Sequence, residues 1–355
     1  MLLLYFFYAY LMIIIGFGLV ITYLNLTVYQ EHWKRGNYRP KVLVIVPCRG
    51  MDYKLEENLT AFKKQKYDNY KLVAVIDDKK DKALPVIKKL NIGYLVCGRP
   101  KSGSGKVNAI AVAIEKLGKG FDVFAIGDAD ILTKDNWLAD LITPLKNQNI
   151  GIATAYPYFK AENGFWSKVK MIWSLVGDGM METKLLRFGW GGSLAFRRDL
   201  MNRADLEKFK GAIADDVALT KLAKSKELGL AYVSSAKPIM RATDNFPEFV
   251  EWSNRQTALS MMSNMEVFYI GFPYYLLNFL LFISAVLLTI FYSYIFILLF
   301  IPVILGLIKT GRRLQESYPD FVIISLIMPL VFMTNLLISY HITSIIWRGR
   351  RYKIK

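Results

Sequence analysis

Cysteine is scarce in this sequence, since Cys48 and Cys97 are the only two among 355 residues. Both follow strand-like runs in a segment that the charge distribution, described below, places in the cytoplasm, where disulfide bonds are rare. We therefore expect two buried thiols and no disulfide. Internal repeats and low-complexity linkers are also missing, which excludes a repeat array. The charge run from Lys79 to Lys82 is most simply a solvated surface.

Charged residues are absent from Leu2 to Leu24, a run of Leu, Ile, Phe, Tyr, Val and Gly. Such a run is long enough to cross a hydrocarbon core of about 30 Å at about 1.5 Å per residue. A cleaved signal peptide is the alternative. Against it, the run is about twice the usual apolar core, no basic residue precedes it, and no small-x-small site follows it. We predict an N-terminal transmembrane helix within residues 1–30.

Two further apolar blocks, Phe268 to Ile308 and Phe321 to Ile346, are separated by the polar stretch Lys309 to Asp320. The predicted organisation is a catalytic domain over residues 40–245, an interfacial segment over 246–268, a membrane region over 269–346 with two or three spans, and a basic tail over 347–355. The whole chain would then cross the membrane three or four times.

Basic residues follow the first span directly, so the positive-inside rule places the central domain in the cytoplasm of a multi-pass membrane protein. These residues are Lys34, Arg35, Arg39 and Lys41. The tail is ambiguous. If the block Phe268 to Ile308 crosses twice, the loop with Lys309, Arg312 and Arg313 lies inside and the basic tail lies outside. If part of that block only lies in the interface, the tail returns inside.

Acidic residues are outnumbered, with 29 Asp and Glu against 46 Lys and Arg, for a formal charge of +17. Such an excess fits a nucleic-acid surface, an anionic bilayer surface or phosphate-bearing substrates. The predicted spans favour the last two, and we expect no nucleic-acid partner.

Short β-branched runs alternate with amphipathic stretches between about Lys41 and Val233, which predicts an α/β fold around a mostly parallel sheet. The expected strands are Val42 to Val46, Leu72 to Ile76, Ile92 to Val96, Val123 to Ile126 and Ile150 to Ala155. The expected helices are Glu56 to Gln65, Ala83 to Leu90, Lys106 to Leu117 and Asn136 to Leu145. Ligands of such sheets bind at the carboxyl ends of the strands. Polar residues follow there: Pro47 and Arg49, Asp77 and Asp78, and Asp128 and Asp130.

Asp128 and Asp130 bracket Ala129 directly after an apolar strand. Two carboxylates at a sheet edge suit Mg²⁺ or Mn²⁺, which prefer few carboxylates together with substrate phosphate oxygens. An isolated Asp-x-Asp also occurs by chance in many turns.

Asp215 and Asp216 open a helical stretch that runs to Lys226. Acidic residues in a first helical turn are ordinarily favourable caps. The functional alternative is that one of them removes the proton from an acceptor hydroxyl, since a neutral alcohol is a poor nucleophile.

Gly103 to Ile110 invites a P-loop interpretation, but Pro100 stands where the motif needs Gly, and Val107 where it needs Ser or Thr. Lys106 at a helix start could still contact a diphosphate. Farther along, Arg255 in the segment Trp252 to Gln256 could steady a departing diphosphate. The alternative for that segment is an anchor at the membrane interface.

In this order the motifs resemble the family 2 glycosyltransferases, most closely the ceramide glucosyltransferase-like membrane branch. The matches are Ile76-Asp77-Asp78, Gly105-Lys106-Val107-Asn108, Asp128-Ala129-Asp130, Ala214-Asp215-Asp216 and the segment Trp252 to Gln256. Asp215 stands where relatives more often have Glu, and Trp252 and Gln256 occupy the outer positions of the last motif.

The resemblance implies a GT-A fold and an inverting single displacement. It implies donor binding by Asp77, metal and diphosphate binding by Asp128 with Asp130, a base at Asp216, and leaving-group assistance by Arg255. Pro47, Arg49, Asp78 and Lys106 join the donor side, and Asp215 stands beside the base. Trp190 and Gly192 lie where the family forms a loop beside the acceptor, and we place Trp252 and Gln256 on that side too. Trp190 in a packed turn is the alternative.

The stretch Trp166 to Leu186 is apolar, and we favour helix packing over a lipid-acceptor groove. The leading functional hypothesis is transfer of a sugar from a nucleotide sugar, a UDP-sugar rather than a GDP-sugar, to a membrane lipid. A processive polysaccharide synthase of the same superfamily and a non-catalytic nucleotide-binding scaffold are the alternatives.

Overall fold

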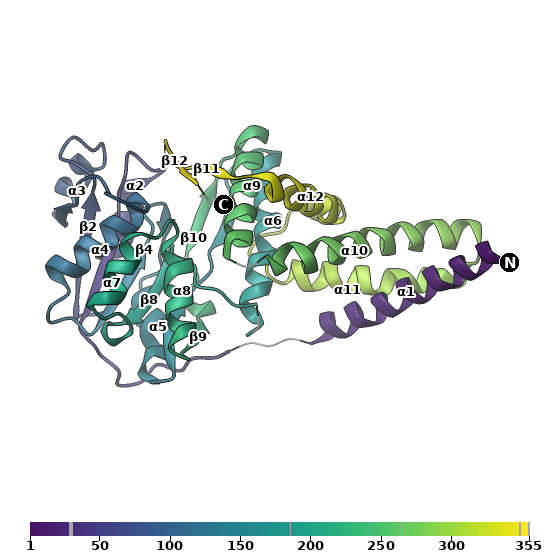
Figure 1. Ribbon diagram of the computed structural model, residues 1–355, viewed down its shortest axis with the longest axis horizontal. Coiled ribbons are helices and arrows are strands. Elements are labelled where there is room, and N and C mark those ends of the chain that lie inside the picture. The colour runs from purple at the N-terminus through teal and green to yellow at the C-terminus, as the bar shows by residue number, and fades with distance from the viewer. Residues whose placement is uncertain (28–30, 185, 264, 348, 354–355) are drawn as a thin grey trace. The chain divides into compact units, whose positions relative to one another are not determined.

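The computed structural model describes residues 1–27, 31–184, 186–263, 265–347 and 349–353 (Figure 1). The chain divides into two compact units. One comprises Gln30–Thr243, and the other combines Met1–Tyr29 with Asp244–Lys355. We call them the catalytic unit and the membrane unit.

The catalytic unit is built on a seven-stranded sheet in the order β3-β2-β1-β4-β8-β6-β9. Its strands are β1 (Val42–Pro47), β2 (Tyr70–Ile76), β3 (Gly93–Val96), β4 (Val123–Gly127), β6 (Ile150–Thr154), β8 (Ser193–Arg197) and β9 (Gly229–Tyr232). Every neighbouring pair is parallel except the two that β8 makes with β4 and β6. The five expected strands and the mostly parallel α/β fold are confirmed. Strands β8 and β9 were not predicted.

Helices cover both faces of this sheet. Alternate residues of β1 point to opposite faces of the sheet. Val44 belongs to a buried cluster with residues of α2 and α5, whereas Leu43 belongs to one with residues of α4 and α8. The helices are α2 (Leu55–Lys63), α3 (Leu84–Lys89), α4 (Gly105–Leu117), α5 (Trp137–Ile142), α6 (Phe165–Glu182), α7 (Arg203–Lys210) and α8 (Asp215–Ser225). A small second sheet joins β5 (Ile131–Leu132), β10 (Ile239–Ala242) and β7 (Tyr158–Ala161).

Helix α6 packs into the core, as expected for the stretch Trp166 to Leu186. Met171, Trp173, Leu175 and Met181 are buried, which confirms the packing interpretation. The two cysteines are free; Cys48 is buried as predicted, but Cys97 is only half-buried.

The membrane unit has four helical segments that are long and apolar enough to cross a membrane. They are α1 (Leu2–Leu26), α10 (Glu266–Phe291), the segment Tyr294–Gly311 made of a 3₁₀ turn and α11 (Phe300–Gly311), and α12 (Phe321–His341). Helix α9 (Phe246–Ser263) precedes them, and a hairpin of β11 (Ser344–Trp347) and β12 (Arg350–Lys353) follows. Figure 1 shows α1, α10 and α11 running side by side.

Candidate active site

The carboxyl ends of β1, β2 and β4 bring the predicted donor-side residues to one edge of the sheet, because these three strands are parallel neighbours. Pro47 ends β1, and Arg49 beyond it lies 3.7 Å through Nε from Asp77 Oδ2 at the end of β2. Asp78, one residue further, is exposed, and its Oδ1 accepts a hydrogen bond from the Lys80 amide at 2.6 Å.

Asp77 is anchored by the strand beside it. The backbone carbonyl of Asp77 accepts a hydrogen bond from the Gly98 amide at 3.1 Å. The side-chain Oδ1 of Asp77 lies 3.8 Å from Cys97 Sγ. Asn108 on α4 in turn donates to the Gly98 carbonyl at 3.1 Å. Burial, together with the nearby Asp77 charge, raises the pKa of Cys97 to about 11.

Lys106 lies at the centre of the acidic residues. From the first turn of α4 its Nζ reaches Asp128 Oδ1 at 2.7 Å and Asp215 Oδ1 at 3.3 Å. The side chains of Lys106 and Asp215 are 11% and 4% exposed, whereas that of Asp128 is 27% exposed. Ser104 starts α4 by accepting from the Val107 amide at 3.2 Å, which fixes the turn that carries Lys106.

The electrostatics of this cluster follow from its burial. Burial alone would lower the pKa of Lys106, but the attraction of Asp128 and then Asp215 outweighs it, so the pKa of Lys106 is raised. Burial raises the pKa of Asp215 to about 7, although the Lys106 ammonium opposes the shift. Burial also raises the pKa of Asp216, against the Lys106 charge and two backbone amides.

A glycine turn holds Asp216 next to Asp128. The Gly191 amide donates to Asp216 Oδ2 at 3.2 Å, and the Gly192 carbonyl accepts from the Asp128 amide at 3.1 Å. The turn has no room for side chains, since a Cβ at Gly191 would lie 2.3 Å from Asp215 Oδ2. A Cβ at Gly192 would lie 2.1 Å from the Trp190 ring. Asp128, Asp215 and Asp216 therefore converge on Lys106 from separate parts of the chain.

The model of glycosyl transferase family 21 matches residues 8–355. The chain belongs to this family. Ceramide glucosyltransferase 1 of Caenorhabditis elegans is 26% identical over 141 residues, which are 38% of this chain and 30% of that protein. The chain thus matches about a third of the length of this relative. The family assignment and this relative confirm the resemblance to the ceramide glucosyltransferase branch, although the matching family carries the number 21 and the motifs suggested family 2.

Two solved structures are similar at low identity. The mannosyltransferase PcManGT of Pyrobaculum calidifontis, in complex with GDP-Man and Mn²⁺, aligns with a TM-score of 0.49 and 14% identity over 93% of this chain and 84% of that one. The glucosyl-3-phosphoglycerate synthase of Mycobacterium tuberculosis, with Mn²⁺, UDP and phosphoglyceric acid, aligns with a TM-score of 0.44 and 12% identity over 66% and 84%.

Several residues around this candidate site were not predicted from the sequence. Thr154 Oγ1 accepts from the Trp190 amide at 2.9 Å, and Trp137 Nε1 donates to Ser193 Oγ at 2.7 Å, so that both brace the glycine turn. Tyr156 packs edge-on against Trp190, with ring centroids 6.0 Å apart. The glycine-rich run around residue 191 was a signal for close backbone approach, but the sequence offers none for Thr154 or Trp137.

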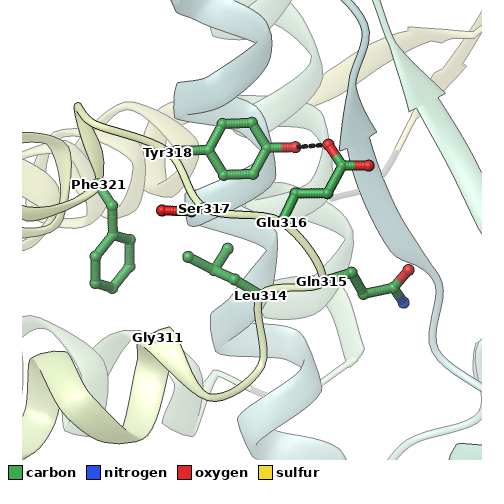
Figure 2. Close-up of a pocket in the computed structure, with 7 residues that line it drawn as sticks. All are labelled: Gly311, Leu314, Gln315, Glu316, Ser317, Tyr318 and Phe321. Atoms are coloured by element: carbon green, nitrogen blue, oxygen red, sulfur yellow. Dashed lines mark hydrogen bonds between the residues drawn. The ribbon is translucent and has the colours of Figure 1, made fainter.

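Three further predicted residues belong to the membrane unit. Arg255, Trp252 and Gln256 lie on α9 in the membrane unit, where Arg255 Nη1 is 3.2 Å from Glu251 Oε1. Their roles stay predictions. The membrane unit also has a pocket of about 380 Å³ between α11 and α12 (Figure 2), and none of the candidate site residues lines it.

The carboxylates fit a divalent cation held partly by substrate. Across the described ranges no group of three or more His, Cys, Asp or Glu forms a ready-made metal site. Asp128 is nevertheless partly exposed, and within the described residues the buried Asp215 Oδ2 has no hydrogen-bond partner. Asp130 lies in the same turn as Asp128. This oxygen-only set suits Mg²⁺ or Mn²⁺ that also coordinates a diphosphate.

Proposed function

We propose that the protein transfers a sugar from a nucleotide sugar, a UDP-sugar rather than a GDP-sugar, to a membrane lipid on the cytoplasmic face. The proposal is carried by the convergence of Asp128, Asp215 and Asp216 around Lys106 at the carboxyl edge of the sheet. The four apolar helices and the similarity to a ceramide glucosyltransferase support a lipid acceptor.

The donor lies along the carboxyl edge of the sheet, from Arg49 and Asp77 to Asp128. Asp77 orients the nucleoside, and the Lys106 ammonium and Arg49 guanidinium face the diphosphate. Asp128 and Asp130 hold Mg²⁺ or Mn²⁺, which when bound neutralises charge on the leaving diphosphate. Arg255 assists departure from the α9 side.

Asp216 serves as the base. It is less buried than Asp215, and each of its oxygens accepts a single backbone hydrogen bond, from the Gly191 and Val217 amides, so lone pairs remain for a hydroxyl proton. Asp215 instead faces the ammonium of Lys106. An acceptor hydroxyl that loses its proton to Asp216 attacks the anomeric carbon from the face opposite the diphosphate, which inverts its configuration. Trp190 and Gly192, with Trp252 and Gln256, line the acceptor side.

Replacing the base tests the proposal. Asp216→Asn keeps the shape of the side chain but loses one of the two backbone hydrogen bonds, because its NH2 group cannot accept from the Gly191 or Val217 amide. The proposed donor-side residues are unchanged, so donor binding should persist. Turnover should fall by about 10²–10⁴-fold, the usual contribution of a general base. Glu207→Gln, at an exposed carboxylate of α7, is the matched control and should leave turnover unchanged. Unchanged transfer by Asp216→Asn would remove Asp216 from the base role.

Substrate identity needs a separate measurement. Calorimetric titration with UDP- and GDP-sugars, each with and without Mn²⁺, should give binding that is stronger with the metal and strongest for a UDP-sugar. Mass spectrometry of membranes incubated with the bound donor should then find one sugar per lipid. A long polymer would favour the synthase alternative, and binding without any transfer would favour the scaffold.

A further inference from the structure

Helices α1 and α10 are antiparallel neighbours in the membrane unit. Their contacts run in opposite order along the two helices: Phe7 with Tyr292, Tyr10 with Ser284, and Phe17 with Tyr274. The last turn of α1 therefore lies at the same end of the bundle as the first turns of α10. We call this the junction end, because the chain passes from it toward the catalytic unit after α1 and returns to it through α9.

Helix α11 runs parallel to α1 and also ends at the junction end. Asn25 near the end of α1 donates through Nδ2 to the Pro302 carbonyl at 3.2 Å. Farther along α11, Lys309 Nζ donates to the Leu24 and Thr27 carbonyls at 2.7 and 3.1 Å. An ammonium at these last carbonyls stabilises the end of α1 and fixes the register of the two helices.

Both ends of α12 lie at the junction end. At its start, the Phe321 ring is 3.5 Å from the position of a Cβ on Gly311, the last residue of α11. At its end, the Tyr340 ring is 4.8 Å from that of Phe268, in the first turn of α10. The polar helix α9 packs there too, since Asn335 Nδ2 donates to Asn254 Oδ1 at 2.8 Å.

A crossing helix cannot have this arrangement. With 21 residues α12 is about 31 Å long, enough to span a hydrocarbon core of about 30 Å. If it crossed alongside α10 and α11, its two ends would lie at opposite ends of the bundle. Figure 1 instead shows α12 beside α9 at one end of the α10–α11 pair. Pro329 in its middle permits a bend.

The surface of α12 that α9 and α10 leave uncovered is apolar, so it suits lipid and not water. Most of its exposed residues are apolar, and four of them recur at helical spacing: Ile323, Ile327, Leu330 and Leu337. No charged residue occurs between Phe321 and Tyr340. Large apolar side chains are also exposed on α1, α10 and α11.

Basic residues flank α12 on both sides along the chain. Lys309, Arg312 and Arg313 precede it, and Arg350, Arg351 and Lys353 follow it in the β11–β12 hairpin. If α12 returned to the side on which it began, all six would face one leaflet, which agrees with the positive-inside rule and with attraction to anionic lipids. If it crossed, the second group would face the opposite side.

We propose that α12 lies in the bilayer surface without crossing it, that the chain crosses the membrane with α1, α10 and the Tyr294–Gly311 segment only, and that the β11–β12 hairpin binds anionic headgroups on the side of the catalytic unit. The tail, which the sequence left ambiguous, then returns to the cytoplasmic side. The proposal is independent of the transferase chemistry.

Labelling with a membrane-impermeant maleimide tests the side of the hairpin. Cys48 and Cys97 are first replaced by Ser, and single cysteines are introduced at Lys79 in the catalytic unit, Tyr294 between α10 and α11, and Lys353 in the hairpin. Lys353→Cys should be labelled from the same side of oriented vesicles as Lys79→Cys and from the side opposite to Tyr294→Cys. Labelling of Lys353→Cys together with Tyr294→Cys would overturn the proposal.

The depth of α12 gives a second, independent measurement. Spin labels at Ile323, Leu330 and Leu337 report depth through their relative accessibility to oxygen and a water-soluble nickel complex. Ile323 and Leu337 should lie at the same shallow depth, whereas labels at Ile270 and Ile290 on α10 should differ by most of the bilayer thickness. A steady change in depth from Ile323 through Leu330 to Leu337 would show a crossing helix.

Headgroup binding by the hairpin is tested with a spin label at Lys353. The mobility of this label should be lower in vesicles that contain anionic lipid than in vesicles without it. Equal mobility in the two kinds of vesicle would overturn the headgroup contact.

Discussion

Removing the ammonium of Lys106 should destabilise the catalytic unit far more than removing an exposed lysine. Lys106→Met keeps the stem but leaves Asp215, which is 4% exposed, facing Asp128 without a counter-ion. Breaking a buried ion pair at one partner costs about 3–5 kcal/mol. The matched control is Lys210→Met, because Lys210 pairs at the surface with Glu115 and Glu207. Such pairs contribute about 0–1 kcal/mol.

Differential scanning fluorimetry of the purified protein in EDTA at pH 8, where Asp215 with its pKa of about 7 is mostly ionised, measures the difference at one scan rate. A domain of this size shifts its midpoint by roughly 2–4 °C per kcal/mol, so we expect Lys106→Met to lower it by roughly 6–20 °C. Lys210→Met should lower it by no more than about 4 °C. Equal shifts for the two variants would refute the view that Lys106 is the buried counter-ion of the acidic cluster.

The pH dependence of the same midpoint adds a directional test. The pKa of Asp215 in the folded state, about 7, is above its ordinary value of 3.8. Its contribution to stability is therefore present in full below about pH 4 and is lost as the pH rises through about 7. Without Lys106 the pKa rises further, so the destabilisation by Lys106→Met should be larger at pH 8 than at pH 5. Adding Asp215→Asn should remove most of this pH dependence.

Two further outcomes follow from the site. Gly191→Ala should lower kcat by at least about tenfold, because its Cβ would meet Asp215 Oδ2 at 2.3 Å, while Gly36→Ala, with open space around it, should not change kcat. Reaction of Cys97 with iodoacetamide, followed by mass spectrometry, should stay slow at pH 8 and accelerate as the pH approaches about 11, and fast alkylation at pH 8 would contradict the raised pKa.

The sequence predicted the parts of the fold that are encoded locally. The apolar run from Val42 identifies β1 without any tertiary information, because a strand buried on both faces is continuously hydrophobic. Asp128 and Asp216 were candidates for the same reason, because Asp128 directly follows β4 and Asp216 lies in the first turn of α8. Their convergence was an expectation from family resemblance, and the structure supplies the geometry.

What the sequence did not predict depends on contacts between distant residues. Strand β8 has the same length as β4 and β6, but its place and its reversed direction are defined only by its pairing with them. Lys106 was expected to face a diphosphate, but its pairing with Asp215, more than a hundred positions away, needs the packed fold. The composition of α12 alone makes it a candidate for a membrane span. That both of its ends lie at the junction end follows only from the contacts with Gly311 and Phe268.

Because β8 runs antiparallel to β4, residues reach the candidate active site from the ends of some strands and from the start of another. Parallel strands deliver the residues that follow them, as β4 delivers Asp128. Strand β8 runs the other way, and so delivers the residues that precede it, including Trp190 and Gly192. The glycine turn before β8 cannot change freely, because Gly191 and Gly192 have no room for a side chain, so at that end of the strand Trp190 is the side chain that can vary. On the proposed acceptor side, a change of acceptor preference would accordingly fall on position 190, while the glycine turn keeps Asp216 in place.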